Sequence, residues 1–184
     1  MERPLVELSI VAAAGRFVAW YSEKGLAELN FPIGRAFSSD CRRRGNESNS
    51  FNSEMVKDSS RRLLQAKIRH WHRATTAALK AVLAGREPEN LPPLDLAGTE
   101  FQKRVWNALR KIGRGRTKSY GEIAQAIGKP KAVRAVGGAC GANPIPVLVP
   151  CHRVLAAHGK IGGFSSGLDW KRVLLAREGV KTQK

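Results

Sequence analysis

The stretch that most restricts the fold of this chain is residues 143–154, which read NPIPVLVPCHRV. Its prolines fix φ at their own positions and bias the residue before each of them toward extended geometry. The apolar run from Val147 to Val149 is typical of a buried strand or extended segment. Asn143 precedes a proline, where its amide can bond nearby backbone and fix a turn. The sequence therefore predicts a stiff, buried segment that ends at a Cys-His-Arg triplet.

The cysteine of that triplet is a candidate nucleophile. His152 and Arg153 follow Cys151 directly, and cationic groups beside a thiol favour the reactive thiolate. Neighbouring side chains of an extended backbone point to opposite faces, so we expect a bridging water rather than direct contact between Cys151 and His152. The alternative is a structural cysteine, because free cysteine is among the most buried residue types.

The charge of the chain is strongly positive and unevenly distributed. The net charge is +17, and residues 95–184 hold 17 Lys and Arg against 5 Asp and Glu, a net charge of +12. A basic half of this kind favours a polyanionic partner, with nucleic acid ahead of an anionic membrane surface. No apolar run is long enough to span a membrane, and three scattered cysteines do not make a disulfide framework. We therefore expect an intracellular protein, in the cytoplasm or in a nucleus, without membrane association.

The N-terminal half, residues 1–94, reads as a small domain of strands and one helix. Residues 4–31 alternate in hydropathy and predict two or three antiparallel strands. Residues 36–60 are polar and predict a mobile surface loop, in which Cys41 would be an exposed thiol. Residues 60–84 place apolar side chains on one helical stripe that would pack on the strands. His70 and His72 lie within this helix, and we expect both at the surface. Three prolines in residues 85–97 predict a connector, with the domain boundary near residue 94.

The C-terminal half, residues 95–184, predicts a mainly helical domain. Thr99 with Gln102 and Ser119 with Glu122 are capping boxes that open two helices. A further helix over residues 131–142 follows a turn and completes a helix-turn-helix. The small residues of the helix over 131–142 offer no base-reading groups. This favours contact that is independent of DNA sequence, at the DNA backbone or in the minor groove. The alternative is a small-residue helix packed on another helix. The expected fold class is α/β in the α+β sense, with a winged-helix-like second domain.

The second half of the chain resembles the O6-alkylguanine-DNA alkyltransferases, also called methylated-DNA–protein-cysteine methyltransferases. The resemblance implies irreversible, single-turnover transfer of an alkyl group from O6 of guanine, and from O4 of thymine, to Cys151. It also implies a monomer that binds double-stranded DNA containing O6-alkylguanine and flips the damaged base out. No cofactor is expected, because the lesion is itself the alkyl donor. The matching segments are GTEFQKRVWNAL (98–109), SYGEIA (119–124), KAVRAVGGA (131–139), NPIPVLVPCHRV (143–154), GKIGGF (159–164) and LLAREG (174–179).

The resemblance also implies roles for individual residues. Cys151 would be the acceptor, with His152 and Glu178 as its relay. Arg134 would fill the gap that the flipped base leaves in the stack, and Tyr120 would contact the phosphate and the base. The other expected substrate or DNA contacts are Asn143, Ser165, Ala132, Gly137 and Phe164. Phe164 stands where tyrosine is common in the family, and Ser166 where glycine is common. Some relatives carry zinc in the N-terminal domain, but this chain has no matching Cys/His set, and we predict no metal.

Three other functions fit parts of the sequence. A non-catalytic binder of alkylated DNA would lack the cysteine at position 151. A cysteine hydrolase would need an oxyanion hole and would turn over repeatedly. A transcription regulator would place polar base-reading residues on its recognition helix, and this helix has few.

Overall fold

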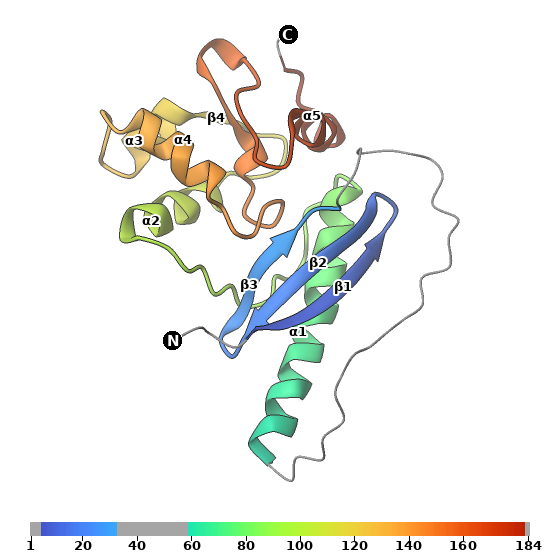
Figure 1. Ribbon diagram of the computed structural model, residues 1–184. Helices are drawn as coiled ribbons and strands as arrows, with labels where there is room; N and C mark the ends of the chain where they lie inside the picture. Colours follow the sequence, from blue (N-terminus) through green and yellow to red (C-terminus); the bar gives the residue numbers. More distant parts are fainter. Residues whose placement is uncertain (1–4, 33–58, 183–184) are drawn as a thin grey trace.

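The computed structural model describes residues 5–32 and 59–182 (Figure 1). The N-terminal part is an antiparallel sheet of β1 (Val6–Ala12), β2 (Gly15–Ser22) and β3 (Gly25–Asn30), in that order. Every second residue of the central strand is buried, namely Phe17, Ala19 and Tyr21. This alternation points one face of the sheet at the core. The predicted strands are confirmed. Of the predicted loop at 36–60, residues 36–58, including Cys41, lie outside the described residues, and residues 59–60 begin the helix that follows.

Helix α1 (Ser59–Leu83) packs across the sheet, as its apolar stripe predicts (Figure 1). Ile68, Thr75, Leu79 and Val82 are buried. The expectation of two surface histidines is wrong for His72, which is partly buried. Its Nδ1 lies 3.2 Å from the hydroxyl of Tyr21, because α1 turns this position toward the sheet.

The connector after α1 joins the sheet rather than hanging free. The amide of Leu26 donates to the carbonyl of Pro93, and the amide of Asp95 donates to the carbonyl of Leu26, both at 2.8 Å. The hydroxyl of Ser22 also donates to the carboxylate of Asp95 at 2.7 Å. These contacts hold the end of the connector against the edge strand β3, and the boundary near residue 94 stays a prediction.

The C-terminal part gathers short helices around a helix-turn-helix. Helix α2 (Glu100–Leu109) and helix α3 (Tyr120–Ala126) both begin with the predicted capping boxes, with each side-chain and backbone bond present. Helix α4 (Val133–Gly141) packs on both of them, and the indole of Trp106 donates to the carbonyl of Ala139 at 2.8 Å. The pair α3 and α4 confirms the helix-turn-helix.

The remaining elements surround the Cys-His-Arg triplet. Strand β4 (Lys118–Ser119) pairs in parallel with β5 (Val154–Leu155). Residues Cys151–Arg153 form one 3-10 turn, Ala157–Gly159 form another, and α5 (Leu168–Arg177) closes the chain. None of the helices described here combines the length and hydropathy needed to cross a bilayer.

The two parts share a continuous core. Phe31, at the end of the sheet, makes edge-on ring contacts with Trp170 of α5 and with Phe164, with centroids 4.8 and 6.0 Å apart. The amide of Leu29 donates to the carbonyl of Pro144 at 2.9 Å. The sheet therefore contacts the segment that precedes the triplet.

Candidate active site

The segment before the triplet is a tight turn and not the extended run that its hydropathy predicts. Val147 is buried and has φ of 75°, a conformation that a β-branched residue rarely adopts. The amide of Val149 bonds back to the carbonyl of Ile145 at 2.9 Å. Such strain persists only where the surroundings enforce it, here close packing around the turn. Periodicity reports burial but not φ, and this is why the sequence predicts the burial and not the turn.

Asn143 organises this turn and touches the cysteine. Its Oδ1 accepts from the amide of Ile145 at 3.1 Å, as expected for a turn-fixing asparagine. Its Nδ2 donates to the carbonyl of Val149 at 2.8 Å and to Sγ of Cys151 at 3.1 Å. A donor aimed at sulfur stabilises the thiolate relative to the thiol. Asn143 therefore couples the shape of the turn to the reactivity of Cys151.

Arg153, which the sequence places beside the thiol, is paired with Glu178 instead. Cys151 is 4% exposed, and burial raises the pKa of its thiol, against the lowering effects of Asn143 and Lys171. Burial also lowers the pKa of His152, so that the imidazole is neutral at pH 7. The triplet is a 3-10 turn, so the extended-strand argument about the Cys151 and His152 side chains does not apply to it.

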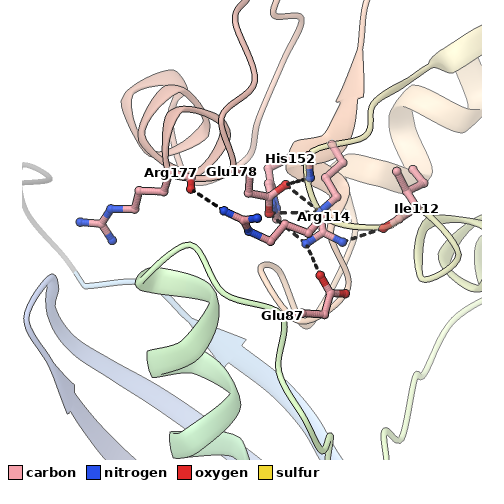
Figure 2. A network of polar contacts seen from close by, with 8 residues as sticks. Glu87, Ile112, Arg114, His152, Arg177 and Glu178 are labelled. Carbon is pink, nitrogen blue, oxygen red and sulfur yellow. Dashed lines mark hydrogen bonds and ion pairs between the residues drawn. The ribbon is translucent and has the colours of Figure 1, made fainter.

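His152 is oriented by Glu178 (Figure 2). Its Nε2 lies 3.0 Å from Oε1 of Glu178, and its ring is fully buried. Burial opposes ionisation of Glu178, but hydrogen bonds from His152 and Arg153 outweigh it and lower the pKa of the carboxyl to about 2. An ionised carboxylate only accepts, so Nε2 carries the proton and Nδ1 presents a lone pair. Nδ1 has no hydrogen-bond partner among the described residues.

The carboxylate of Glu178 accepts hydrogen bonds from two segments, the Cys-His-Arg triplet and the loop 113–118. Arg153 donates Nε to both oxygens at 3.0 and 3.1 Å and Nη2 to Oε1 at 2.9 Å. The amide of Gly115, in the basic loop 113–118, donates to Oε2 at 3.2 Å. Nη1 of Arg153 donates to the carbonyl of Ile112 at 2.6 Å, a contact drawn in Figure 2. Glu178 thus has no solvent-facing role at its helix end, and α5, the basic loop and the triplet are held together.

Of the residues expected at DNA on α4, Arg134 is exposed, whereas Gly137 is partly buried. Ala135 and Gly138 of the same helix are also exposed, as is Lys131, two residues before its start. A Cβ added at Gly137 or Gly138 would meet nothing within 4 Å. Internal packing therefore does not require these glycines, although glycine within a helix costs about 1 kcal/mol relative to alanine. Ala132 caps the start of this helix and is partly buried.

The loop 159–167 lies against Tyr120, and its predicted contact residues differ in exposure. A Cβ on Gly162, which has φ of 65°, would lie 3.3 Å from the ring of Tyr120. Tyr120 is partly buried, and burial raises the pKa of its hydroxyl. Ser165 is exposed, while Phe164 is partly buried and its ring contacts Phe31. The structure thus brings Tyr120 to the loop and places Phe164 against the N-terminal sheet.

One buried residue at the site has no counterpart in the sequence prediction. Lys171 of α5 is fully buried, and its Nζ donates to the carbonyls of Val154 and Gly163 at 2.6 and 3.0 Å. The only signal in the sequence is its place between Trp170 and the apolar pair Leu174 and Leu175 on the inner side of α5. In the part of the chain described, no group of three or more metal-ligating side chains comes together.

Fold and site together define a class: helix-turn-helix proteins with a buried cysteine that accepts a hydrogen bond from an asparagine just after the second helix of the pair. The family model for the DNA-binding domain of 6-O-methylguanine DNA methyltransferase matches residues 100–180. A methylated-DNA–protein-cysteine methyltransferase of Methanosarcina acetivorans is 53% identical over 107 residues, which cover 58% of this chain and 69% of the relative. One of Mycolicibacterium paratuberculosis is 57% identical over 100 residues, which cover 54% of this chain and 61% of the relative. The chain belongs to the methylated-DNA–protein-cysteine methyltransferase family.

A solved structure extends the likeness to the N-terminal part. The crystal structure of Mycobacterium tuberculosis OGT in complex with DNA superposes with a TM-score of 0.66 at 36% identity. The superposition covers 92% of this chain and 90% of that chain. The α+β fold inferred from the sequence is therefore confirmed over both parts.

Proposed function

We propose that this protein repairs DNA by moving an alkyl group from O6 of guanine, or from O4 of thymine, onto Cys151. The observation that carries the proposal is the fully buried His152, whose Nε2 lies 3.0 Å from Oε1 of Glu178 and whose Nδ1 has no hydrogen-bond partner among the described residues. A thiol of raised pKa needs such a base, because the thiolate is the nucleophile. Names of the relatives, which describe methyl transfer from DNA to a protein cysteine, support the same reaction.

The transfer balances without any cofactor. His152 takes the thiol proton, directly or through a bridging water, and Sγ attacks the alkyl carbon in line with the bond to O6. The S–C bond forms as the C–O6 bond breaks, and the bonding pair stays on the guanine. The proton held by His152 then neutralises the guanine, which leaves unmodified. A thioether remains on Cys151, and nothing in this chemistry reverses it, so each molecule acts once.

The site supports base flipping as the way of access. Cys151 is 4% exposed, so a base inside a duplex cannot reach it unless the base leaves the stack. The exposed small residues of α4 allow close approach to a groove, and Arg134 is exposed on the same helix. The partner is accordingly double-stranded DNA that carries the lesion. We also propose that the protein acts as a monomer inside the cell, where its thiol stays reduced.

Arg134→Ala tests the flipping step. We expect a loss of transfer on duplex DNA of about tenfold or more, because flipping costs a few kcal/mol that the arginine helps to offset. Transfer from a free O6-alkylguanine base needs no flipping and should change less than twofold. Single-turnover rates on both substrates measure the difference, with Lys131→Ala as the control for loss of one exposed charge two residues before α4. An equal loss on both substrates would exclude a role in filling the stack.

The reaction itself is tested by mass. The protein is incubated with duplex DNA carrying O6-methylguanine and digested, and the peptide containing Cys151 should gain one methyl group. Titration of lesion against protein should stop at one equivalent. Continued turnover would indicate a hydrolase, and binding with no mass change would indicate a non-catalytic reader of lesions.

A further inference from the structure

Lys171 is fully buried, and no carboxylate pairs with it among residues 5–32 and 59–182. Burying an ammonium costs free energy unless its donors are satisfied, and a carboxylate usually supplies the balance. Nζ of Lys171 instead donates to two backbone carbonyls, those of Val154 and Gly163. The nearest acidic residues in the sequence pair with other groups. Asp169 pairs with Arg172 at 3.0 Å, and Glu178 pairs with His152 and Arg153.

The two carbonyls belong to the two segments that must meet for transfer. Val154 opens β5, three residues after Cys151. Gly163 lies in the loop 159–167, where a Cβ on the neighbouring Gly162 would lie 3.3 Å from the ring of Tyr120. Lys171 is therefore a clamp between the backbone that carries the acceptor and the loop that contacts Tyr120. A change at Nζ would move the two segments relative to each other.

The ammonium is also a charge available to the thiolate. Arg153 is engaged by Glu178, and His152 is neutral at pH 7. The titratable groups that interact electrostatically with Lys171 are the thiols of Cys151 and Cys140 and the ring of His152. Burial lowers the pKa of Lys171 to about 8, against the opposing effect of the two cysteines, and this value still leaves it protonated at pH 7.

We propose that Lys171 is a positioning residue for alkyl transfer, whose buried ammonium both clamps the loop at Gly163 to the backbone after Cys151 and stabilises the thiolate. The proposal rests on the proposed function for its transfer step but not for its effect on the thiol. It replaces the expectation from the sequence that His152 and Arg153 supply the positive charge.

The test compares three variants. Lys171→Met keeps length and removes charge and donors, and Lys171→Arg keeps the charge. Arg172→Met removes one charge from the exposed side of the same helix. The first readout is the pH profile of Cys151 alkylation by iodoacetamide, followed by peptide mass without DNA. The second is the single-turnover rate with DNA carrying O6-methylguanine, and thermal unfolding confirms that each variant folds.

In Lys171→Met, the midpoint of the alkylation profile should rise by about one pH unit or more, the usual effect of losing a neighbouring opposite charge. Transfer at pH 7 should fall at least tenfold. Lys171→Arg should keep the wild-type midpoint while its transfer rate falls, because a guanidinium does not fit the ammonium's two carbonyls. Arg172→Met should match the wild type in both readouts.

An unchanged midpoint and a transfer rate within twofold of the wild type in folded Lys171→Met would overturn the proposal. Failure of the proposed function gives a different pattern. The wild type would then take no methyl group from DNA, while the shift in the iodoacetamide profile of Lys171→Met would persist.

Discussion

Cys151→Ser is expected to abolish alkyl transfer, with a loss of about 10⁴-fold or more, as for removal of the nucleophile in other enzymes. A serine hydroxyl is a far weaker nucleophile than a thiolate, and the buried site offers it no stronger base than neutral His152. Affinity for lesion DNA should stay within a few-fold, because Cys151 is buried and makes no part of the exposed face of α4. Mass analysis after incubation with lesion DNA and a fluorescence binding titration measure the two effects.

The chain provides a matched control for this substitution. Cys140 is also a buried free thiol, on α4, where burial raises its pKa to about 12. Cys140→Ser introduces the same change in the same core and should leave transfer within a few-fold of the wild type. Residual transfer in Cys151→Ser, or its loss in Cys140→Ser alone, would contradict the assignment of Cys151 as acceptor.

Glu178→Gln is expected to reduce both stability and transfer. Loss of one partner of a buried ion pair costs about 3 kcal/mol, because Arg153 keeps its charge without a carboxylate. Transfer should fall about 100-fold, the usual contribution of acid–base catalysis, since His152 loses the charge that supports its protonated form. The iodoacetamide profile of Cys151 should move to higher pH for the same reason.

The pH dependence of this destabilisation has a definite sign. The folded-state pKa of Glu178 is about 2 and its ordinary value is 4.5. Its stabilising contribution is therefore complete above pH 4.5 and is lost as pH falls toward 2. The difference in unfolding free energy between wild type and Glu178→Gln, from urea titrations, should be largest near pH 7 and shrink across that window.

Glu87→Gln is the control for Glu178. Glu87 lies 3.9 Å from Arg153 but its side chain is 60% exposed, so this pair should contribute less than about 1 kcal/mol. A loss in Glu178→Gln that is no larger than in Glu87→Gln, with an unchanged alkylation profile, would exclude the His152–Glu178 relay.

The local features of this fold could be predicted from the sequence because their causes lie within a few residues. The capping boxes at Thr99 and Ser119 join a residue to the backbone three positions on. The stripe of α1 needs only helical periodicity to mark its buried face. The acceptor segment is equally local, because its prolines and the adjacent Cys-His-Arg mark it, whereas Glu178 follows only from the family resemblance.

The tertiary structure decided the backbone conformation, the burial and the charge of those residues. Packing that periodicity does not encode determines three features: the left-handed backbone conformation of Val147, the ring contacts of Phe164 and the partial burial of His72. The partners of Glu178 lie 25, 26 and 63 residues away, and this network draws Arg153 away from the thiol. Burial in the shared core makes His152 neutral and encloses Lys171 beside the acceptor. The sequence by itself determined where the thiol, the imidazole and the carboxylate lie along the chain. Their charges depend on solvent exclusion and on partners brought together only by the complete fold, and only the tertiary structure decided them.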